Sequence, residues 1–301
     1  MSAAEPISTR EPWAVTVLRL MRPKHWLKNV FVLAPALFSE RLLNADVLLH
    51  ALAGVLAFCW LSSAMYIVND VRDRAADAAH PRKRRRPVAS GRVSPAVAIG
   101  LAAGLATLAG VWAIATLPAP FLLYLAAYAV NTMLYIVWLK YRVIVDVVMI
   151  AGGFVIRLLS GCAAVQVEPS PWLLACGFSL ALVLGFGKRL AEVEAPGVTA
   201  THRETLQAYT REKLMMVLSV CTAVCVMSYI LYTLAPDTVA RHGTQNLMYT
   251  VPFVVYGTFR YIFRSMEAKA DGPTDLLTGD PTFLLCGFGW GAAVLAVLVW
   301  K

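Results

Sequence analysis

The stretch DVLLHALAGVLAFCWLSSAMYIV, residues 46–68, leads directly into NDVRDRAADAAHPRKRRRPVASG, residues 69–91. The first stretch is apolar, and as a helix it is long enough to cross the roughly 30 Å hydrocarbon layer of a bilayer. The second stretch places three aspartates and a dense run of arginines where that helix leaves the membrane. Together the two stretches predict a membrane-embedded helical protein with a charged functional loop.

The aspartates of this loop have the spacing of one helical face. Asp70, Asp73 and Asp77 lie at positions i, i+3 and i+7 of a helix that continues from the apolar stretch. Mg²⁺ prefers oxygen ligands and usually takes one or two carboxylates, leaving its other positions to water and substrate phosphates. We therefore predict Mg²⁺ as the cofactor and a catalytic role for the three aspartates, and the predicted metal ligands are Asp70, Asp73, Asp77 and Asn69. The alternative is an ordinary solvated loop whose basic run holds anionic headgroups.

The composition is typical of an integral membrane protein. Hydrophobic residues occupy 59% of the 301 positions, and charged residues only 15%. We predict an all-α polytopic membrane protein with nine transmembrane helices in one bundle. The predicted spans are 29–44, 46–68, 94–115, 119–138, 143–163, 171–187, 214–235, 246–264 and 281–300.

The distribution of basic residues predicts the orientation. With a cytoplasmic N-terminus, every Lys and Arg falls on the cytoplasmic side except Arg41, Arg241 and Lys301, which fall outside, and Arg157, which lies within a span. The C-terminus is then outside the cell, and the expected location is the inner (plasma) membrane. No cleavable signal is expected, because residues 1–12 lack an apolar core and the segment from Trp13 to Asn29 reads as a basic amphipathic helix.

The same pattern predicts the domain organisation. Residues 1–28 are expected to form a cytoplasmic interfacial segment, and residues 29–301 a single nine-helix transmembrane domain. Four cytoplasmic loops are expected to meet over one mouth of the bundle and to carry the active site. These loops are 69–93, 139–146, 186–213 and 264–280.

Further polar residues on these loops are candidates for substrate binding. Lys188, Arg189 and Glu192 lie within about one helical turn after the sixth span. Two cations can hold phosphate oxygens, and a glutamate can bind a metal or a sugar hydroxyl. Snorkelling of the two cations to the headgroups is the alternative. The predicted substrate-binding residues are Asn69, Lys24, Lys28, Arg72, Lys83, Arg86, Lys140, Arg157, Lys188, Arg189 and Glu192.

Two residues have open interpretations. Arg157 lies about three turns into a span, where a guanidinium facing lipid would cost several kcal/mol. It either binds a substrate anion or pairs structurally with a polar partner such as Asp146 or a carbonyl. His25 lies in the basic run before the first span and is open to a headgroup contact or to acid–base chemistry.

The aspartate loop resembles a known group of enzymes. Members of the UbiA superfamily of intramembrane prenyltransferases have nine helices and carry an Asn-Asp-x-x-Asp-x-x-x-Asp signature after the second helix. Asn69, Asp70, Asp73 and Asp77 match this signature. The likeness spans nearly the whole chain.

Three other stretches resemble one branch of that superfamily, which transfers a phosphoribosyl group to decaprenyl-type phosphates. They are Arg-Pro-Lys-x-Trp-x-Lys-Asn at 22–29, His-Pro-x-Lys-x-x-Arg-Pro-Val-Ala-Ser-Gly at 80–91, and Lys-Arg-x-Ala-Glu at 188–192. Ordinary prenyltransferases of the superfamily carry a second Asp-x-x-x-Asp motif after the sixth helix, whereas residues 185–213 contain no Asp. Cations and a glutamate in its place suit a donor with a phosphate and ribose hydroxyls.

The resemblance implies a polyprenyl-phosphate phosphoribosyltransferase. Such an enzyme uses Mg²⁺ to transfer the 5-phosphoribosyl group of phosphoribosyl pyrophosphate to polyprenyl phosphate, releases pyrophosphate, and supplies a pentose donor for the cell envelope. The expected partners are these two substrates and the lipid bilayer; a homo-oligomer is left open, and no nucleic acid is expected. The alternatives are prenyl transfer from a polyprenyl diphosphate to an aromatic acceptor such as 4-hydroxybenzoate, and a non-catalytic transporter or scaffold.

Overall fold

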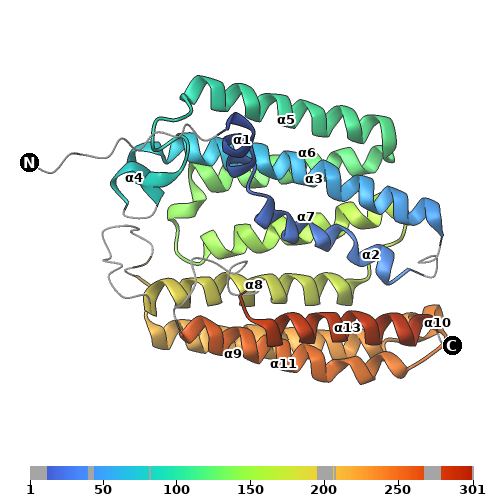
Figure 1. Ribbon diagram of the computed structural model, residues 1–301. Coiled ribbons are helices and arrows are strands. Elements are labelled where there is room, and N and C mark those ends of the chain that lie inside the picture. Colours follow the sequence, from blue (N-terminus) through green and yellow to red (C-terminus); the bar gives the residue numbers. More distant parts are fainter. Residues whose placement is uncertain are drawn as a thin grey trace, which may run out of the picture.

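The long helices of the protein run side by side in one bundle (Figure 1). The computed structural model describes residues 12–39, 44–80, 83–194, 206, 208–267 and 279–299, and within these ranges it contains helices and no strands. The elements are α1 (Trp13–Met21), the 3₁₀ helix η1 (Pro23–Val32), α2 (Ala34–Leu37), α3 (Ala45–Arg72), α4 (Arg74–Ala79), η2 (Lys83–Arg85), α5 (Pro95–Thr116), α6 (Ala119–Val137), η3 (Leu139–Tyr141), α7 (Val145–Val165), α8 (Pro171–Glu194), α9 (Arg211–Leu234), α10 (Pro236–His242), η6 (Asn246–Thr250), α11 (Val251–Met266) and α13 (Pro281–Val299).

Seven of the described helices are long and apolar enough to cross a membrane. They are α3, α5, α6, α7, α8, α9 and α13. The prediction of an all-α polytopic membrane fold is therefore confirmed, whereas the number of nine spans is not. The predicted span 246–264 is divided between η6 and the 16-residue helix α11.

The first predicted span, 29–44, is wrong as a continuous α-helix. Its described part consists of the end of η1 and the four-residue helix α2, and residues 40–43 lie outside the described ranges. Pro35 lies in the first turn of α2, where its missing N–H is tolerated, but it cannot continue a helix from the preceding turn. The amphipathic helix expected from Trp13 to Asn29 likewise ends at Met21, and η1 replaces its second half.

A close backbone contact holds this broken segment against α7. A Cβ atom added at Gly161 would lie 2.3 Å from the carbonyl oxygen of Val32 and 3.0 Å from the ring of Pro35. Small residues at helix interfaces in membranes permit such close approach. The glycine of α7 therefore fits the path of the broken segment across the bundle.

Several helix termini gather at one end of the bundle, where α4 also lies (Figure 1). Helices α3, α6, α8 and α11 end there, and α5, α7 and α9 begin there. We call this the charged end. Short connections between successive helices force neighbouring helices to run in opposite directions, so alternate loops return to the same end. The blue segment in Figure 1 shows α1, η1 and α2 running from near the charged end toward the opposite end.

The contact at Gly161 makes a stability prediction. Gly161→Ala places a methyl group against backbone, which cannot rotate away, and overpacking of this kind costs about 1–3 kcal/mol. We expect a lower midpoint of thermal unfolding in detergent, measured by intrinsic fluorescence. Gly152→Ala on the same helix is the control, because its Cβ would meet Asn131 at an ordinary 3.5 Å. Equal midpoints for the two variants would contradict the close contact.

Candidate active site

Two of the three predicted catalytic aspartates lie together at the charged end. Asp70 is in the last turn of α3 and Asp77 is in α4, and their exposed fractions are only 2% and 4%. Arg86 Nη1 lies 3.1 Å from Asp70 Oδ1 and 2.6 Å from Asp77 Oδ2. Arg22 Nη2 lies 2.5 Å from the same oxygen of Asp70. These two carboxylates are therefore close enough to share one cation.

Asp73 takes a different direction. Helix α3 ends at Arg72, and Asp73 forms the junction to α4 with φ −87° and ψ 6°. The expectation of three aspartates on one face of a continuous helix is therefore wrong, because the helix is interrupted at the middle aspartate. Asp73 Oδ1 accepts a hydrogen bond from Lys140 Nζ of η3 at 2.5 Å. The structure thus joins the 69–93 and 139–146 loops through the Asp73–Lys140 ion pair.

Within the described ranges, no three His, Cys, Asp or Glu side chains form a group that would hold a metal ion. Asp70 and Asp77 nevertheless fit Mg²⁺, because two carboxylates that share one cation are what this ion usually takes from a protein. Asn69 is half-buried beside Asp70 on α3, and Asp73 follows one turn later. The metal ligands predicted from the sequence therefore lie at one end of the bundle, although they do not converge on one point.

A cluster of cations surrounds His25 in η1. The imidazole ring packs on Tyr66 with centroids 5.1 Å apart. Burial first, and then the positive charges of Lys28, Arg22, Lys188 and Arg86, together lower the pKa of His25 from 6.5 to about 3. His25 is therefore neutral near pH 7 and cannot serve as a general acid there. The same charges show that η1, the loop after α4 and α8 place cations near one another.

The predicted cluster on α8 is partly a structural ion pair. Arg189 and Asp146 are both fully buried, and Arg189 Nε lies 3.0 Å from Asp146 Oδ2. Arg189 also binds Glu192, and Lys188 Nζ lies 3.7 Å from the other Glu192 oxygen. Arg189 therefore links α7 to α8 from inside the bundle, whereas Lys188 and Glu192 are half-buried nearer the surface.

Tyr209 completes this pair from the segment before α9. Its hydroxyl donates to Asp146 Oδ1 at 2.9 Å and accepts from the backbone N–H of Ile144 at 2.7 Å. Burial and the Asp146 carboxylate raise the pKa of Tyr209 to about 12, so the hydroxyl remains a donor. Ile144 has φ +69°, which is strained for a β-branched residue. No sequence motif indicated Tyr209, because its partners are distant in the chain.

Arg157 pairs with polar groups, as one of its two interpretations expected. Its Nε donates to Asn29 Oδ1 at 2.9 Å, Nη1 to the carbonyl of Gly153 at 3.0 Å, and Nη2 to the hydroxyl of Tyr128 at 3.0 Å. A carbonyl is therefore among its partners, whereas the suggested partner Asp146 is not, because Asp146 is taken by Arg189.

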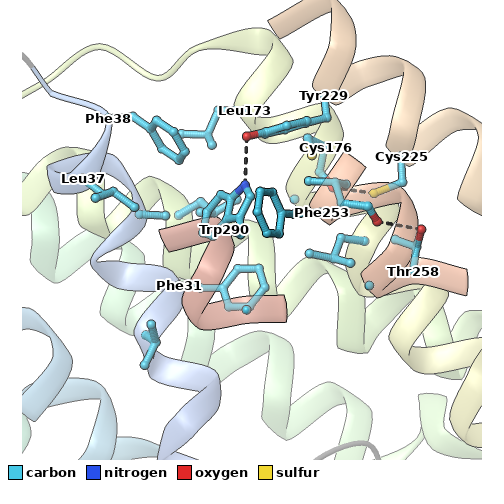
Figure 2. Close-up of a pocket in the computed structure, with 18 of the residues that line it drawn as sticks. Phe31, Leu37, Phe38, Leu173, Cys176, Cys225, Tyr229, Phe253, Thr258 and Trp290 are labelled. Atoms are coloured by element: carbon cyan, nitrogen blue, oxygen red, sulfur yellow. Dashed lines mark hydrogen bonds between the residues drawn. The ribbon is translucent and has the colours of Figure 1, made fainter. Parts of the chain in front are cut away.

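A large apolar cavity lies inside the bundle. Its volume is about 570 Å³, and Figure 2 shows residues that line it, from the broken N-terminal segment (Phe31, Leu37, Phe38), from α8 and α9 (Leu173, Cys176, Cys225, Tyr229), and from α11 and α13 (Phe253, Thr258, Trp290). Polar groups in this wall bind one another: Trp290 Nε1 donates to the Tyr229 hydroxyl at 2.9 Å. Val30 and Leu184 also line the cavity, close in sequence to Lys28 and Lys188. The cavity therefore approaches the cations around His25.

A family model described as the UbiA prenyltransferase family matches residues 30–278. The chain belongs to the UbiA prenyltransferase family. The match includes the broken segment after Asn29, the aspartate loop and the helices from α2 to α11. It therefore covers both the charged end and most of the cavity wall of this UbiA-family protein.

Two relatives match this UbiA-family chain over most of its length. Decaprenyl-phosphate phosphoribosyltransferase of Mycobacterium tuberculosis (strain H37Rv) is 30% identical, over 98% of this chain and 99% of the relative. The enzyme of the same name from Corynebacterium glutamicum is 29% identical, over 96% of this chain and 89% of the relative. A UbiA homologue of Archaeoglobus fulgidus solved with GPP and Mg²⁺ has a TM-score of 0.70 at 19% identity, covering 94% of this chain and 99% of that one, and shows the fold alone.

Three predicted substrate-binding residues of this UbiA-family site are exposed. Arg72 is exposed and donates to the carbonyl of Val137 at 2.7 Å, so it caps the end of α6. Lys24 and Lys83 are exposed. The structure instead adds two residues that were not among the predicted site residues: Arg22, which already stood in the basic run, and Tyr66, which carried no signal because it lies within an apolar span.

The pKa of His25 makes a prediction about acid stability. The folded-state pKa of about 3 lies below the ordinary value of 6.5. As the pH falls, the unfolded chain therefore binds a proton at His25 before the folded protein does. The neutral His25 thus contributes to the free energy of unfolding fully above pH 6.5, and this contribution is lost between pH 6.5 and 3. We expect wild type to lose more thermal stability than His25→Gln between pH 7 and pH 4.5. Parallel losses in calorimetry of both proteins would contradict a buried neutral imidazole.

Proposed function

We propose that this protein transfers the 5-phosphoribosyl group of phosphoribosyl pyrophosphate to a decaprenyl-type polyprenyl phosphate and releases pyrophosphate. The relatives named decaprenyl-phosphate phosphoribosyltransferase support this reaction, because they match nearly the whole chain at 29–30% identity. The structural observation that carries the proposal is a buried carboxylate and cation cluster at one end of a bundle that also holds a large apolar cavity, whose wall includes Val30 and Leu184, close in sequence to Lys28 and Lys188. An amphiphilic acceptor and a charged sugar donor need these two environments side by side.

The aspartate loop has the residues to bind the diphosphate end of the donor. Asp70 and Asp77, with Asp73 and Asn69 beside them, would hold Mg²⁺, which neutralises negative charge on the leaving pyrophosphate when bound. Arg86 and Arg22 already lie at these carboxylates, so they are placed to contact diphosphate oxygens. Charge-assisted hydrogen bonds from Arg to phosphate are among the stronger polar contacts that a protein offers.

The α8 residues suit the sugar and its 5-phosphate. Lys188 contributes to the positive field around His25, where a phosphate would be stabilised. Glu192 is a half-buried acceptor for ribose hydroxyls, and its carboxylate is oriented by Arg189. Because Arg189 is fully buried, we assign it the role of positioning Glu192 and Asp146, not of touching substrate.

The chemistry requires little proton transfer. The bond between the anomeric carbon and the pyrophosphate oxygen breaks, and its electron pair leaves with pyrophosphate. An oxygen of the acceptor phosphate forms the new bond to that carbon. The acceptor phosphate is already an anion near neutral pH, so positioning and charge stabilisation supply the rate enhancement. The neutral His25 agrees with this, since no general base is needed.

The cavity and the orientation complete the proposal. The polyprenyl chain lies in the apolar cavity and continues into the bilayer, with its phosphate directed to Lys28 and Lys188.

The protein lies in the plasma membrane with its charged end facing the cytoplasm, because the basic residues concentrate on that side. The soluble donor then reaches the site directly from the cytoplasm.

Prenyl transfer is the second candidate. The protoheme IX farnesyltransferase of Azotobacter vinelandii is 31% identical over 62% of this chain, and the A. fulgidus homologue was solved with GPP. Against prenyl transfer, residues 185–213 lack the second aspartate motif that such a donor requires.

The donor experiment separates the two candidates. Purified protein in detergent with Mg²⁺ receives labelled phosphoribosyl pyrophosphate and polyprenyl phosphate in one reaction, and labelled geranyl diphosphate with 4-hydroxybenzoate in another. We expect a lipid-soluble labelled product and free pyrophosphate only in the first reaction. A product in the second reaction alone would refute phosphoribosyl transfer.

Metal binding tests the aspartate assignment without catalysis. Arg86 and a divalent ion compete for the same two oxygens, so Arg86→Gln is expected to tighten Mn²⁺ binding to the protein alone. Asp70→Asn is expected to weaken it at least about tenfold, since even outer-shell changes cost that much. Electron paramagnetic resonance of Mn²⁺ measures the Mn²⁺ affinity of both variants. Asp237→Asn, exposed in α10, is the control, and equal Mn²⁺ affinity in Asp70→Asn and Asp237→Asn would refute the metal site.

A further inference from the structure

Arg157 is held in a closed protein environment inside the bundle. Its side chain is buried, and all three guanidinium nitrogens donate to protein groups. Its Cζ lies 4.4 Å from the ring centroid of Tyr128, 5.6 Å from that of Phe58 and 5.5 Å from that of Phe154. Rings of this kind stabilise a desolvated cation by cation–π contact. Among the described residues, none of its contacts is a carboxylate.

These contacts disfavour a substrate-binding role. An anion would have to displace a hydrogen bond or an aromatic ring to reach the guanidinium. Arg157 is also absent from the wall of the apolar cavity, although its neighbour Leu158 lines that wall. The buried charge needs another explanation, because a charge inside a membrane protein is costly and usually serves function.

One partner of Arg157, Asn29, belongs to η1, the helix that also carries His25 and Lys28. Asn29 is fully buried at the C-terminal part of η1. Its Oδ1 accepts from Arg157 of α7, and its Nδ2 lies 3.3 Å from both Ser62 Oγ and Cys59 Sγ of α3. An amide that accepts one bond and donates two has used most of its hydrogen-bonding capacity. Asn29 therefore joins η1 to two long helices at once.

The element that Asn29 fixes is unusual and needs such contacts. A 3₁₀ helix of ten residues is much longer than the three or four residues that are common. Toward the charged end, Trp26 Nε1 donates to Ser63 Oγ at 3.0 Å, and Arg22 binds Asp70. Lys28, adjacent to Asn29, and His25 lie on this same helix. Their place in the cation cluster therefore depends on how firmly η1 is held.

We infer that Arg157 is a positioning residue: through Asn29 it fixes η1 so that Lys28 and the other cations around His25 face the substrate phosphate. The catalytic consequence rests on the proposed function, whereas the structural consequence does not. Loss of Arg157 should release η1 from α7 and from the face of α3 that carries Cys59. Loss of Asn29 should have the same effect, because both residues form one connection.

A double-mutant cycle with Asn29→Ala and Arg157→Gln tests this. We expect each variant to raise the KM for polyprenyl phosphate about tenfold, with a much smaller change in kcat. A tenfold change lies within the range of interaction free energies found between contacting residues. The double variant should be no worse than either single variant. Arg157→Lys, which keeps a donor near Asn29, should recover part of the loss. Additive losses, or a loss confined to Arg157→Gln, would overturn the inference and indicate direct substrate binding.

A second readout is independent of the reaction. Cys59 has an exposed fraction of 5% and lies under Asn29, so peptide mapping after treatment with a membrane-permeable maleimide should show little labelling in wild type. We expect faster labelling of Cys59 in both single variants. Thr222→Val, a buried change on α9, is the control and should leave the labelling of Cys59 and the KM unchanged. Unchanged labelling in Asn29→Ala overturns the positioning role even if Arg157→Gln fails to insert or the proposed reaction is wrong.

Discussion

The neutralisation of buried charge is the constraint on which this structure depends. A carboxylate or guanidinium removed from water is stable only when an opposite charge or several hydrogen bonds replace the lost hydration. Asp70 and Asp77 meet this requirement through Arg86 and Arg22, and Asp146 through Arg189 and Tyr209. The contacts of Arg86 stay within one loop, whereas those of Arg22, Arg189 and Tyr209 join elements that are distant in the sequence. The charged end is therefore assembled by the same interactions that make its charges tolerable inside a membrane protein.

The broken N-terminal segment follows the same logic. Irregular backbone at membrane depth is tolerated where it is buried in protein. Here η1 packs against α3 and α7 with Asn29 and Val32 buried, and the close approach at Gly161 brings its backbone into contact with the bundle. A regular α-helix over the same residues would present Asn29, His25 and Lys28 at different angles. The irregular helix is thus the means by which polar groups of the N-terminal segment reach the charged end.

The apolar cavity and these buried charges give the site two chemically distinct halves. Its wall comes from the broken segment and from α8, α9, α11 and α13 (Figure 2), with Leu48 of α3 and Leu158 of α7. Several polar atoms in this wall bind other protein groups, as in the contact between Trp290 and Tyr229, so the surface offered to a ligand is apolar. The substrate proposed here is divided in the same way, with a phosphate at one end and a hydrocarbon chain behind it.

Hydropathy and charge in the sequence determined the membrane class, the positions of seven long helices and the loop that contains Asp70, Asp73 and Asp77, because these signals are local and their periods are those of a helix. The tertiary structure alone decided which charge meets which partner. Asp73 binds Lys140 across 67 residues, and Arg157 binds Asn29 across 128. It also decided that η1 is a 3₁₀ helix and that α3 stops before Asp73. No local pattern encodes these outcomes, since they arise from the mutual packing of helices and from the need of each buried charge for a partner.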